Sequence, residues 1–242
     1  MPIRHVEESD RPRLQEIARR SMESSYSLSP SAINGAVQTW YGPDGFAEKL
    51  ADTDLMLMIV ELEDEPVAFS ESTAQGERGD VLWLHVDPMY RGQGIGNELY
   101  EATVEALSER GASAFRGRVL VDNAAGNAFY EQQGLSKAAE GRVTIDGESH
   151  VENIYSEPID GEARLRITGP EGAELIVDTS EGERGSKAEF QEVFSDSDRD
   201  RRWGYYCSNC ESLVSSMDTM GRMECNGCGN QRRPTRWDAA YL

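Results

Sequence analysis

The segment from residue 86 to residue 96 reads Val-Asp-Pro-Met-Tyr-Arg-Gly-Gln-Gly-Ile-Gly. Before it, an apolar and β-branched run over 81–86 is typical of a buried strand, which ends at Pro88 because proline cannot continue a central strand. After Gly94 the apolar residues have helical spacing, up to a glycine that is a typical helix stop: Ile95, Leu99, Ala102, Ala106 and then Gly111. A strand, a glycine loop and a helix start in this order aim backbone N–H groups and the positive helix end at an anion, typically a phosphate.

Two common phosphate-binding loops do not fit this segment. The dinucleotide loop needs G-x-G-x-x-G, whereas the glycines here stand at 92, 94 and 96. The nucleoside-triphosphate loop ends in Gly-Lys-Ser/Thr, which the segment lacks. The pattern that remains is Arg91-x-x-Gly94-x-Gly96 after a strand that ends at Val86. It resembles the acyl-CoA pyrophosphate loop of the GCN5-related N-acetyltransferases (GNAT family).

A second segment, over residues 119–135, supports the same resemblance. It reads as a short buried strand followed by a helix. Four of its residues fit the family pattern for this place: Asn123, Tyr130, Glu131 and Gly134. Leu135 stands where the family usually has phenylalanine. The resemblance covers roughly residues 1–158 and implies an α/β (α+β) fold, with a mixed sheet flanked by helices.

The other elements of this region are predicted from local patterns. They are a strand over 3–6, a helix that opens at 9–12, a helical region over 30–51 with a break at 42–45, and a strand pair over 55–62 and 66–73. Asp146-Gly147 between apolar runs signals a second hairpin with a type I′ turn. The order β-α-α-β-β-β-α-β-α-β-β matches the mixed sheet of the family. The helical region carries aromatic residues that either shape an acceptor pocket or pack in the core: Trp40, Tyr41 and Phe46.

The resemblance implies a binding site for acetyl-CoA. In the family, the strand that carries Val86 splays from the next strand, and its free main-chain groups bind the pantetheine arm and the acetyl carbonyl. The implied cofactor-binding residues are Val86, Arg91, Gly92, Gln93, Gly94, Ile95, Gly96, Asn97 and Asn123. Arg91 and the backbone N–H groups of 93–97 would hold the pyrophosphate. A backbone N–H near Val86 would donate to the thioester oxygen, and Asn123 would bind the pantetheine arm.

The resemblance also implies the catalytic residues. Tyr130 would protonate the departing thiolate as a general acid, and the alternative is a packed aromatic on an amphipathic helix. Family members often place a glutamate six residues before the position of Val86, where this chain has Asp80. Asp80 is therefore the first candidate for the general base. Its alternative is an exposed turn residue after Gly79.

Two further side chains are candidates for the base. Glu71 is the second choice. His85 has a suitable ordinary pKa, and strand alternation predicts that its side chain points in the same direction as those of Val81 and Trp83. The alternative for His85 is a structural histidine whose nitrogens are satisfied within the fold.

The composition is strongly acidic. The net charge is −20, with 44 acidic against 24 basic residues, and only three lysines are present. The acidic residues are dispersed along the chain, which is typical of proteins from salt-saturated cytoplasm and predicts a haloarchaeal type of protein. The alternative is an acidic protein whose charge faces a partner. Apolar runs are too short to span a bilayer and the N-terminal segment lacks a signal-peptide pattern, so we expect a cytoplasmic protein without membrane contact.

All four cysteines lie in two C-x-x-C pairs that 14 residues separate: Cys207, Cys210, Cys225 and Cys228. This pattern predicts a zinc ribbon over about 203–242 in which Zn²⁺ is structural. The alternatives are disulfides, a redox pair or an iron–sulfur centre. We therefore expect a GNAT domain over 1–158 and a small β-rich domain over 159–242, with a charged connector at 195–202. Its first strands are expected around four apolar residues: Leu165, Ile167, Leu175 and Ile176.

Basic and aromatic residues gather toward the C-terminal end: Arg201, Arg202, Trp203, Arg232, Arg233, Arg236 and Trp237. They either contact RNA or an acidic partner, or they offset neighbouring acids in a module that adds stability. The expected activity is acetyl transfer from acetyl-CoA to a primary amine, on a small molecule, a protein N-terminus or a lysine. The alternatives are a CoA-binding sensory module without catalysis, and an acetyltransferase that the ribbon docks on RNA or the ribosome. A homodimer is a further expectation from the family.

Overall fold

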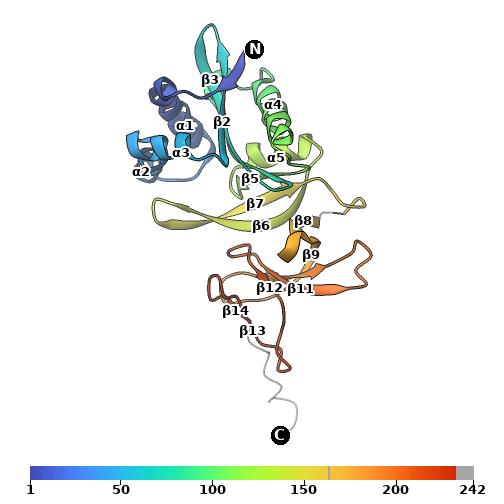
Figure 1. Cartoon of the computed structure of the whole chain (residues 1–242). Helices are drawn as coiled ribbons and strands as arrows, with labels where there is room; N and C mark the ends of the chain where they lie inside the picture. The colour runs from blue at the N-terminus through green and yellow to red at the C-terminus, as the bar shows by residue number, and fades with distance from the viewer. Residues whose placement is uncertain (163, 233–242) are drawn as a thin grey trace. The chain divides into compact units, whose positions relative to one another are not determined.

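The computed structural model describes residues 1–162 and 164–232. The chain divides into two compact units. The first comprises Met1–Leu135 and Val143–Glu157, and the second comprises Ser136–Arg142 together with the residues from Pro158 on (Figure 1). Among the helices of the described residues, none is long and apolar enough to cross a membrane.

The first unit is built on a seven-stranded sheet with the order β1-β2-β3-β4-β5-β7-β6, of whose edge strand β6 only residues 143–145 belong to this unit. Its strands are β1 (Ile3–His5), β2 (Leu55–Leu62), β3 (Glu65–Gln75), β4 (Arg78–Val86), β5 (Ala114–Leu120), β6 (Ser136–Ile145) and β7 (Glu148–Ser156). Its helices are α1 (Arg11–Ser25), α2 (Pro30–Tyr41), α3 (Pro43–Ala51), α4 (Ile95–Glu109) and α5 (Ala124–Gln132). β4 and β5 pair in parallel, and the mixed sheet predicted from the sequence is confirmed. The predicted element order is also confirmed, except that the second predicted helical region forms two helices, α2 and α3.

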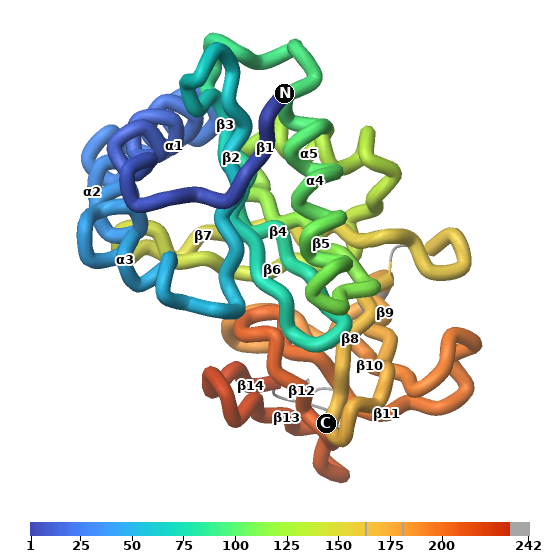
Figure 2. The backbone as a smooth tube through the Cα atoms, turned by 45° about the horizontal axis from the view of Figure 1, so that its top comes forward, coloured from blue at the N-terminus to red at the C-terminus, as the bar shows by residue number. Residues whose placement is uncertain are grey.

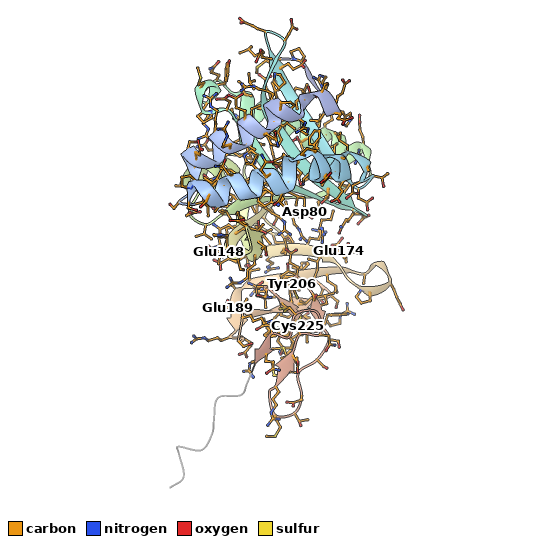
Figure 3. All side chains as sticks on the ribbon, turned by 90° about the vertical axis from the view of Figure 1, so that its left-hand side faces the viewer. Asp80, Glu148, Glu174, Glu189, Tyr206 and Cys225 are labelled. Atoms are coloured by element: carbon orange, nitrogen blue, oxygen red, sulfur yellow. The ribbon has the colours of Figure 1, made fainter. Side chains whose placement is uncertain are left out.

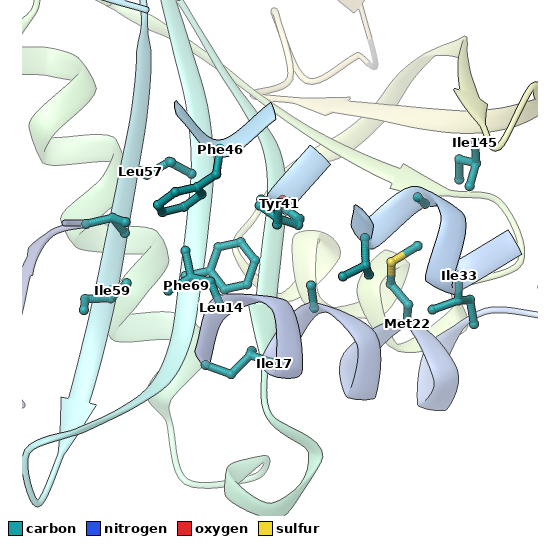
Figure 4. Close-up of a cluster of buried hydrophobic side chains, with 14 of the residues drawn as sticks. Leu14, Ile17, Met22, Ile33, Tyr41, Phe46, Leu57, Ile59, Phe69 and Ile145 are labelled. Atoms are coloured by element: carbon teal, nitrogen blue, oxygen red, sulfur yellow. The ribbon is translucent and has the colours of Figure 1, made fainter. Parts of the chain in front are cut away.

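The helices cover the two faces of this sheet separately, as Figure 2 shows. One core lies between the sheet and α1, α2 and α3, and ten of its buried side chains are labelled in Figure 4. Tyr41 and Phe46 are fully buried in this core, so the core-packing interpretation of these two aromatics is confirmed. The second core lies under α4 and α5 and includes Leu99 and Tyr130. β4 is therefore the central strand of the first unit, with a hydrophobic core on each of its faces.

Local turn chemistry explains two boundaries. The predicted break at 42–45 is shorter than expected, because α3 begins directly at Pro43, and proline is favoured in the first turn of a helix. Asp146 and Gly147 between β6 and β7 have φ values of 49° and 81°, the left-handed backbone that a type I′ turn requires. The predicted hairpin is therefore confirmed, although both of its strands are longer than the apolar pattern indicated.

β4 contains a bulge that the sequence pattern did not predict. Ser72 of β3 is opposite Val81 and Glu71 is opposite Trp83, so Leu82 is an extra residue in β4. Because the extra residue shifts the alternation, Val81 packs in the core under α4 while Trp83 packs against the core under α1–α3. The predicted common direction of His85, Trp83 and Val81 is therefore wrong for Val81.

β4 and β5 run side by side only at their first residues. The parallel pairs begin at Arg78–Ala114 and end at Val81–Gly117, immediately before the bulge. On its other side β4 stays paired with β3 as far as Val86. Within the described chain, the second half of β4 thus has one strand neighbour instead of two.

The second unit contains a five-stranded antiparallel sheet with the order β12-β11-β10-β9-β8. Its strands are β8 (Arg164–Thr168), β9 (Glu174–Glu183), β10 (Phe190–Phe194), β11 (Arg202–Cys207) and β12 (Leu213–Val214), and a two-stranded sheet adds β13 (Met223–Glu224) and β14 (Gln231–Arg232). The strands expected around Leu165 and Leu175 are confirmed as β8 and β9. Arg233, Arg236 and Trp237 lie outside the described residues.

Candidate active site and cysteine cluster

A cavity of about 420 Å³ opens where β4 and β5 separate. Its wall includes Leu84 and Val86 from β4, Arg118 and Val119 from β5, and residues of α1, α4 and α5. All the predicted cofactor residues except Gln93 line it, and Tyr130 does as well. Asp80 does not. The two sequence segments that suggested the family thus meet at one cavity.

The glycine loop ends at the first turn of α4. Gly94 caps this helix with φ of 84°, a left-handed conformation that costs residues with a β-carbon about 1–2 kcal/mol. The backbone N–H groups at the start of a helix have no partner within it, and the helix dipole adds positive potential there. Because Ile95 and Gly96 line the cavity, this end of α4 suits an anionic group.

A buried carboxylate that sequence analysis did not identify fixes this loop. Asp87 is fully buried, and its Oδ2 accepts hydrogen bonds from Arg13 at 3.1 Å and Arg20 at 2.9 Å. Its Oδ1 accepts from the N–H of Met89 at 3.0 Å. An aspartate directly before proline is a turn signal, but its two arginine partners come from α1 and are not predictable from the local sequence.

Arg91 lines the cavity but contacts α1. Its guanidinium donates to Ser21 Oγ at 3.1 Å and to Ser25 Oγ at 3.0 Å, and its Nε donates to the carbonyl of Val86 at 3.3 Å. The two serines are on the last turn of α1. Arg91 therefore joins the glycine loop, the end of β4 and the end of α1, in addition to any contact with a ligand.

Asn123 begins α5. Its Oδ1 accepts from the N–H of Gly126 at 2.9 Å, which satisfies one of the first donors of the helix. Its side chain also forms a hydrogen bond with Tyr26. Burial raises the pKa of Tyr26 to about 12. The capping bond orients the side chain at the cavity wall. Tyr26 faces the same cavity from the segment after α1.

Tyr130 is tightly packed, and only 3% of its surface is exposed. Its ring stacks on Tyr155, with centroids 5.6 Å apart, and contacts Tyr100 edge-on at 6.0 Å. A β-carbon on Gly117 would lie 2.2 Å from the Tyr130 ring, so only glycine fits there. No described residue forms a hydrogen bond with the hydroxyl of Tyr130. Burial raises its pKa well above the usual value, so this hydroxyl stays protonated.

Asp80 lies within β4 and only 3% of its surface is exposed (labelled in Figure 3). The alternative of an exposed turn residue is therefore wrong. Its carboxylate is 2.8 Å from Nε of Arg78 and 3.8 Å from Nε of Arg118. An ion-paired carboxylate outside the cavity is poorly placed to accept a proton from a substrate in it.

Glu71 is also buried and held by two donors. It accepts from the hydroxyl of Tyr41 at 2.9 Å and from Nζ of Lys49 at 2.5 Å. It does not line the cavity. The sequence pattern could not reveal this network, because Glu71 is 22 residues from Lys49 and 30 from Tyr41.

His85 stacks on Trp83, with ring centroids 5.5 Å apart, and packs against Phe69. Its Nε2 is buried and has no hydrogen-bond partner among the described residues. Burial first, and the nearby Arg91 charge second, lower the pKa of His85 to about 3. The alternative of a histidine with satisfied nitrogens is therefore wrong for Nε2, and the imidazole is neutral at any physiological pH.

His85 predicts a pH dependence of stability. Its pKa is about 3 in the folded protein and about 6.5 when unfolded, so the unfolded chain takes up the proton as the pH falls below 6.5. The free energy of unfolding should fall by up to about 1.4 kcal/mol per pH unit from this group between those values. Urea titrations of wild type and His85→Phe at pH 4–8 measure this pH dependence of the free energy of unfolding. Equal pH slopes in the two proteins would contradict the expectation.

The four cysteine sulfurs of the second unit lie within 4.8 Å of one another. The Sγ–Sγ distance is 3.7 Å for Cys207–Cys228 and 3.4 Å for Cys210–Cys225. A tetrahedral zinc site with Zn–S bonds of about 2.3 Å has sulfurs about 3.8 Å apart, so the cluster has suitable dimensions. Cys225, labelled in Figure 3, is fully buried in the small core of β10, β11 and β12.

Burial raises the pKa of Cys207 and Cys210, whereas hydrogen bonds to the sulfurs act in the opposite direction and favour the anionic form. Backbone N–H groups two residues after Cys207, Cys210 and Cys228 donate to these sulfurs. The buried side chain of Asn230 donates to Cys207 Sγ at 3.4 Å and to the carbonyl of Ala188 at 2.8 Å. Such contacts orient metal ligands and stabilise thiolates. The residues present thus fit a divalent metal with four thiolate ligands.

Comparison with known proteins identifies the family. Residues 12–135, slightly more than half of the chain, match the acetyltransferase (GNAT) family. The chain belongs to the GNAT family. Residues 171–242 match a second family, described only as one of unknown function (DUF5816). The GNAT match contains both the glycine loop and the segment from Asn123 to Tyr130.

Relatives of this GNAT chain agree in fold. The PaiA N-acetyltransferase of Thermoplasma acidophilum, solved with coenzyme A, has a TM-score of 0.53 and 20% identity, over 63% of this chain and 96% of that one. The ribosomal-protein-alanine N-acetyltransferase of Brucella melitensis has a TM-score of 0.52 and 18% identity, over 66% of this chain and 100% of that one. N-alpha-acetyltransferase 30 of Schizosaccharomyces pombe is 37% identical over 60 residues, which are 25% of this chain and 40% of that protein. The chain thus matches less than half of that curated relative.

Proposed function

We propose that this GNAT protein is an acetyl-CoA-dependent N-acetyltransferase that moves the acetyl group directly from the thioester to a primary amine. The observation that carries the proposal is the cavity between β4 and β5. One end has the first turn of α4, which suits a pyrophosphate, and the same wall includes Val86, Asn123 and Tyr130. Crystallisation of the Thermoplasma relative with coenzyme A supports the choice of cofactor.

In the proposed reaction the amine nitrogen attacks the carbonyl carbon of the thioester. The carbonyl oxygen becomes negative and accepts a hydrogen bond from the main chain near Val86. The carbon–sulfur bond then breaks, the acetyl group stays on nitrogen, and the thiolate receives a proton from the Tyr130 hydroxyl. The nitrogen, which entered as an uncharged amine, releases its surplus proton to water, and Tyr130 regains a proton from solvent, so that the products are the amide and the free thiol of coenzyme A. Asn123, oriented as the cap of α5, would hold the pantetheine arm. The base role predicted for Asp80 is left out of this scheme, because its carboxylate is ion-paired and outside the cavity.

The main alternative is a CoA-binding sensory module without catalysis. One observation favours it: both carboxylate candidates for the base, Asp80 and Glu71, are engaged by basic side chains. Turnover of any amine, lost on replacement of Tyr130, would remove this alternative.

Binding of acetyl-CoA tests the cofactor site first. Calorimetric titration in molar KCl should give micromolar-range affinity for wild type and much weaker binding for Gly94→Ala, because a β-carbon at φ 84° shifts the first N–H groups of α4. Gly76→Ala is the matched control, since Gly76 also has positive φ, 60°, but lies in the turn before β4 and away from the cavity. A folded wild type that does not bind, or equal loss in both variants, would contradict the proposal.

We further propose that the four cysteines hold one structural Zn²⁺. The ion would link the two C-x-x-C pairs, whose strands are too short to form a stable sheet alone. Disulfides are disfavoured, because all four cysteines are free in the structure.

For the arginines near the cysteine cluster, the ion pairs favour the stability module over RNA contact. Arg202 pairs with Glu192 at 2.7 Å, and Arg232 pairs with Glu183 at 2.9 Å. Paired arginines offset acidic neighbours in a chain of net charge −20. The dispersed acidic residues fit a haloarchaeal type of protein that works in molar salt in the cytoplasm.

A further inference from the structure

The side chains that face the cavity include no ordinary proton acceptor. Among the lining residues, all of them in the described part of the chain, there is no aspartate, glutamate or histidine. The ionisable side chains that line it are Tyr26, Tyr90, Arg91, Arg118 and Tyr130. The two arginines are cationic, and burial raises the pKa of both Tyr26 and Tyr130. None of these groups accepts a proton from an ammonium near neutral pH.

The three base candidates from the sequence are committed elsewhere. Asp80 is paired with Arg78, and Glu71 is paired with Lys49. A further carboxylate, Glu152, acts electrostatically on Tyr26 and Tyr130, and it is paired with Arg118 of the cavity wall at 2.6 Å. His85 is almost completely buried, stacked on Trp83, and absent from the cavity wall. With these carboxylates held in ion pairs and no histidine at the cavity wall, the protein is poorly equipped to deprotonate a bound ammonium.

The uncharged fraction of an amine in solution then decides whether it reacts. The α-amino group of a peptide has a pKa of about 7.7–8.0, and the lysine side chain has one of about 10.4. At pH 7 about one α-amino group in seven is uncharged, but only about one lysine amine in 2,500. Resting on the proposed function, we infer that this protein takes amines in their uncharged form, and that its acceptors are α-amino groups of peptides or proteins in preference to lysine side chains.

Two peptides of the same sequence test the inference with the full-length, zinc-loaded protein. The first has a free α-amino group and a norleucine at its second position. The second is acetylated at its N-terminus and has a lysine there. The value of kcat/KM for each is measured from pH 6.5 to 10.5 by thiol release, and the amine of each free peptide is titrated separately.

The first peptide should give a kcat/KM that rises with pH and levels off at the pKa of its own amine, near 8. The second should be about 350-fold poorer at pH 7, the ratio of the two uncharged fractions, and its kcat/KM should continue to rise toward its own pKa, above 10. If the two profiles level off at the same pH, near or below 8, the protein supplies a base that sets the pH dependence for both peptides. That result would overturn the inference and leave the proposed function intact. A lysine peptide that is inert even at pH 10.5 would overturn it too, since shape alone would then select the amine.

If neither peptide is acetylated at any pH while acetyl-CoA still binds, the proposed function fails, and the inference fails with it. Asp80→Asn gives an independent check. Its pH profile with the first peptide should keep the wild-type midpoint, whatever its absolute rate. A midpoint that moves in this variant would identify Asp80 as the base and overturn the inference.

Discussion

Replacement of Tyr130 by phenylalanine should lower kcat for acetyl transfer by about 10²- to 10⁴-fold, the usual contribution of a positioned general acid. The hydroxyl has no described hydrogen-bond partner, and burial keeps it protonated, so its removal takes away a donor at the cavity without breaking a bond within the fold. The Tyr130 ring, pressed between Gly117 and Tyr155, is retained in the variant. The affinity for acetyl-CoA should therefore change little while kcat falls. Calorimetry measures the affinity and steady-state kinetics measure kcat.

Tyr155→Phe is the matched control for this experiment. Tyr155 stacks on Tyr130, but its hydroxyl donates to Asn127 at 3.0 Å and to Glu131 at 3.3 Å, and it does not line the cavity. Its loss should leave kcat within a few-fold of wild type. If Tyr130→Phe retained full turnover, the proton for the thiolate would have to come from another donor, and the proposed role of Tyr130 would be lost.

Removal of the proposed zinc ion should have the second large effect, on folding instead of on chemistry. Structural zinc in zinc-finger peptides contributes an apparent ~10–16 kcal/mol at pH 7. The core around Cys225 contains few apolar residues, so without the ion the segment from β10 to β14 should unfold. Purified protein should hold one zinc per chain. Chelation should expose four reactive thiols and speed hydrogen exchange across β10–β14, and added zinc should reverse both effects.

Two variants distinguish the ligands from their surroundings. Cys225→Ser should abolish zinc binding and mimic chelation. Ser212→Ala removes only the hydroxyl that lies 3.3 Å from Cys210 Sγ, and should weaken zinc affinity by about 10- to 100-fold, as is usual for a contact around a ligand. If hydrogen exchange across β10–β14 stays slow in metal-free protein, the fold of this segment does not depend on a metal, and the cysteines do not form a structural metal site.

The fold of the first unit was predictable because its signals are local. Gly94 as the start of α4, Asp146-Gly147 as a hairpin turn and Pro43 as the start of a helix each act within a few residues. The same holds for the two C-x-x-C pairs, because each pair lies in a short turn of the chain. For such features the chain neighbours supply most of the physical constraint.

The details of the candidate site were less predictable because they depend on distant partners. The extra residue Leu82 exists only through the pairing of β4 with β3, and it changes which side chains share a face with His85. Arg91 contacts Ser21, a residue 70 positions away, across the end of α1. Asp80 reads as a turn residue or a base from its neighbours, but its burial follows from its position in the middle of the sheet. No local pattern contains these relationships.

The parting of β4 and β5 has a consequence for what this protein can admit. An unpaired strand edge at a protein surface invites another chain to add to the sheet, and most proteins therefore cover or shorten such edges. Here the open edge lies at the wall of a cavity that α1 and α5 border. A flexible molecule with amide groups of its own can enter this cavity and form hydrogen bonds with the free main-chain groups of the strand. The open edge thus offers its hydrogen-bonding groups to a ligand inside the cavity.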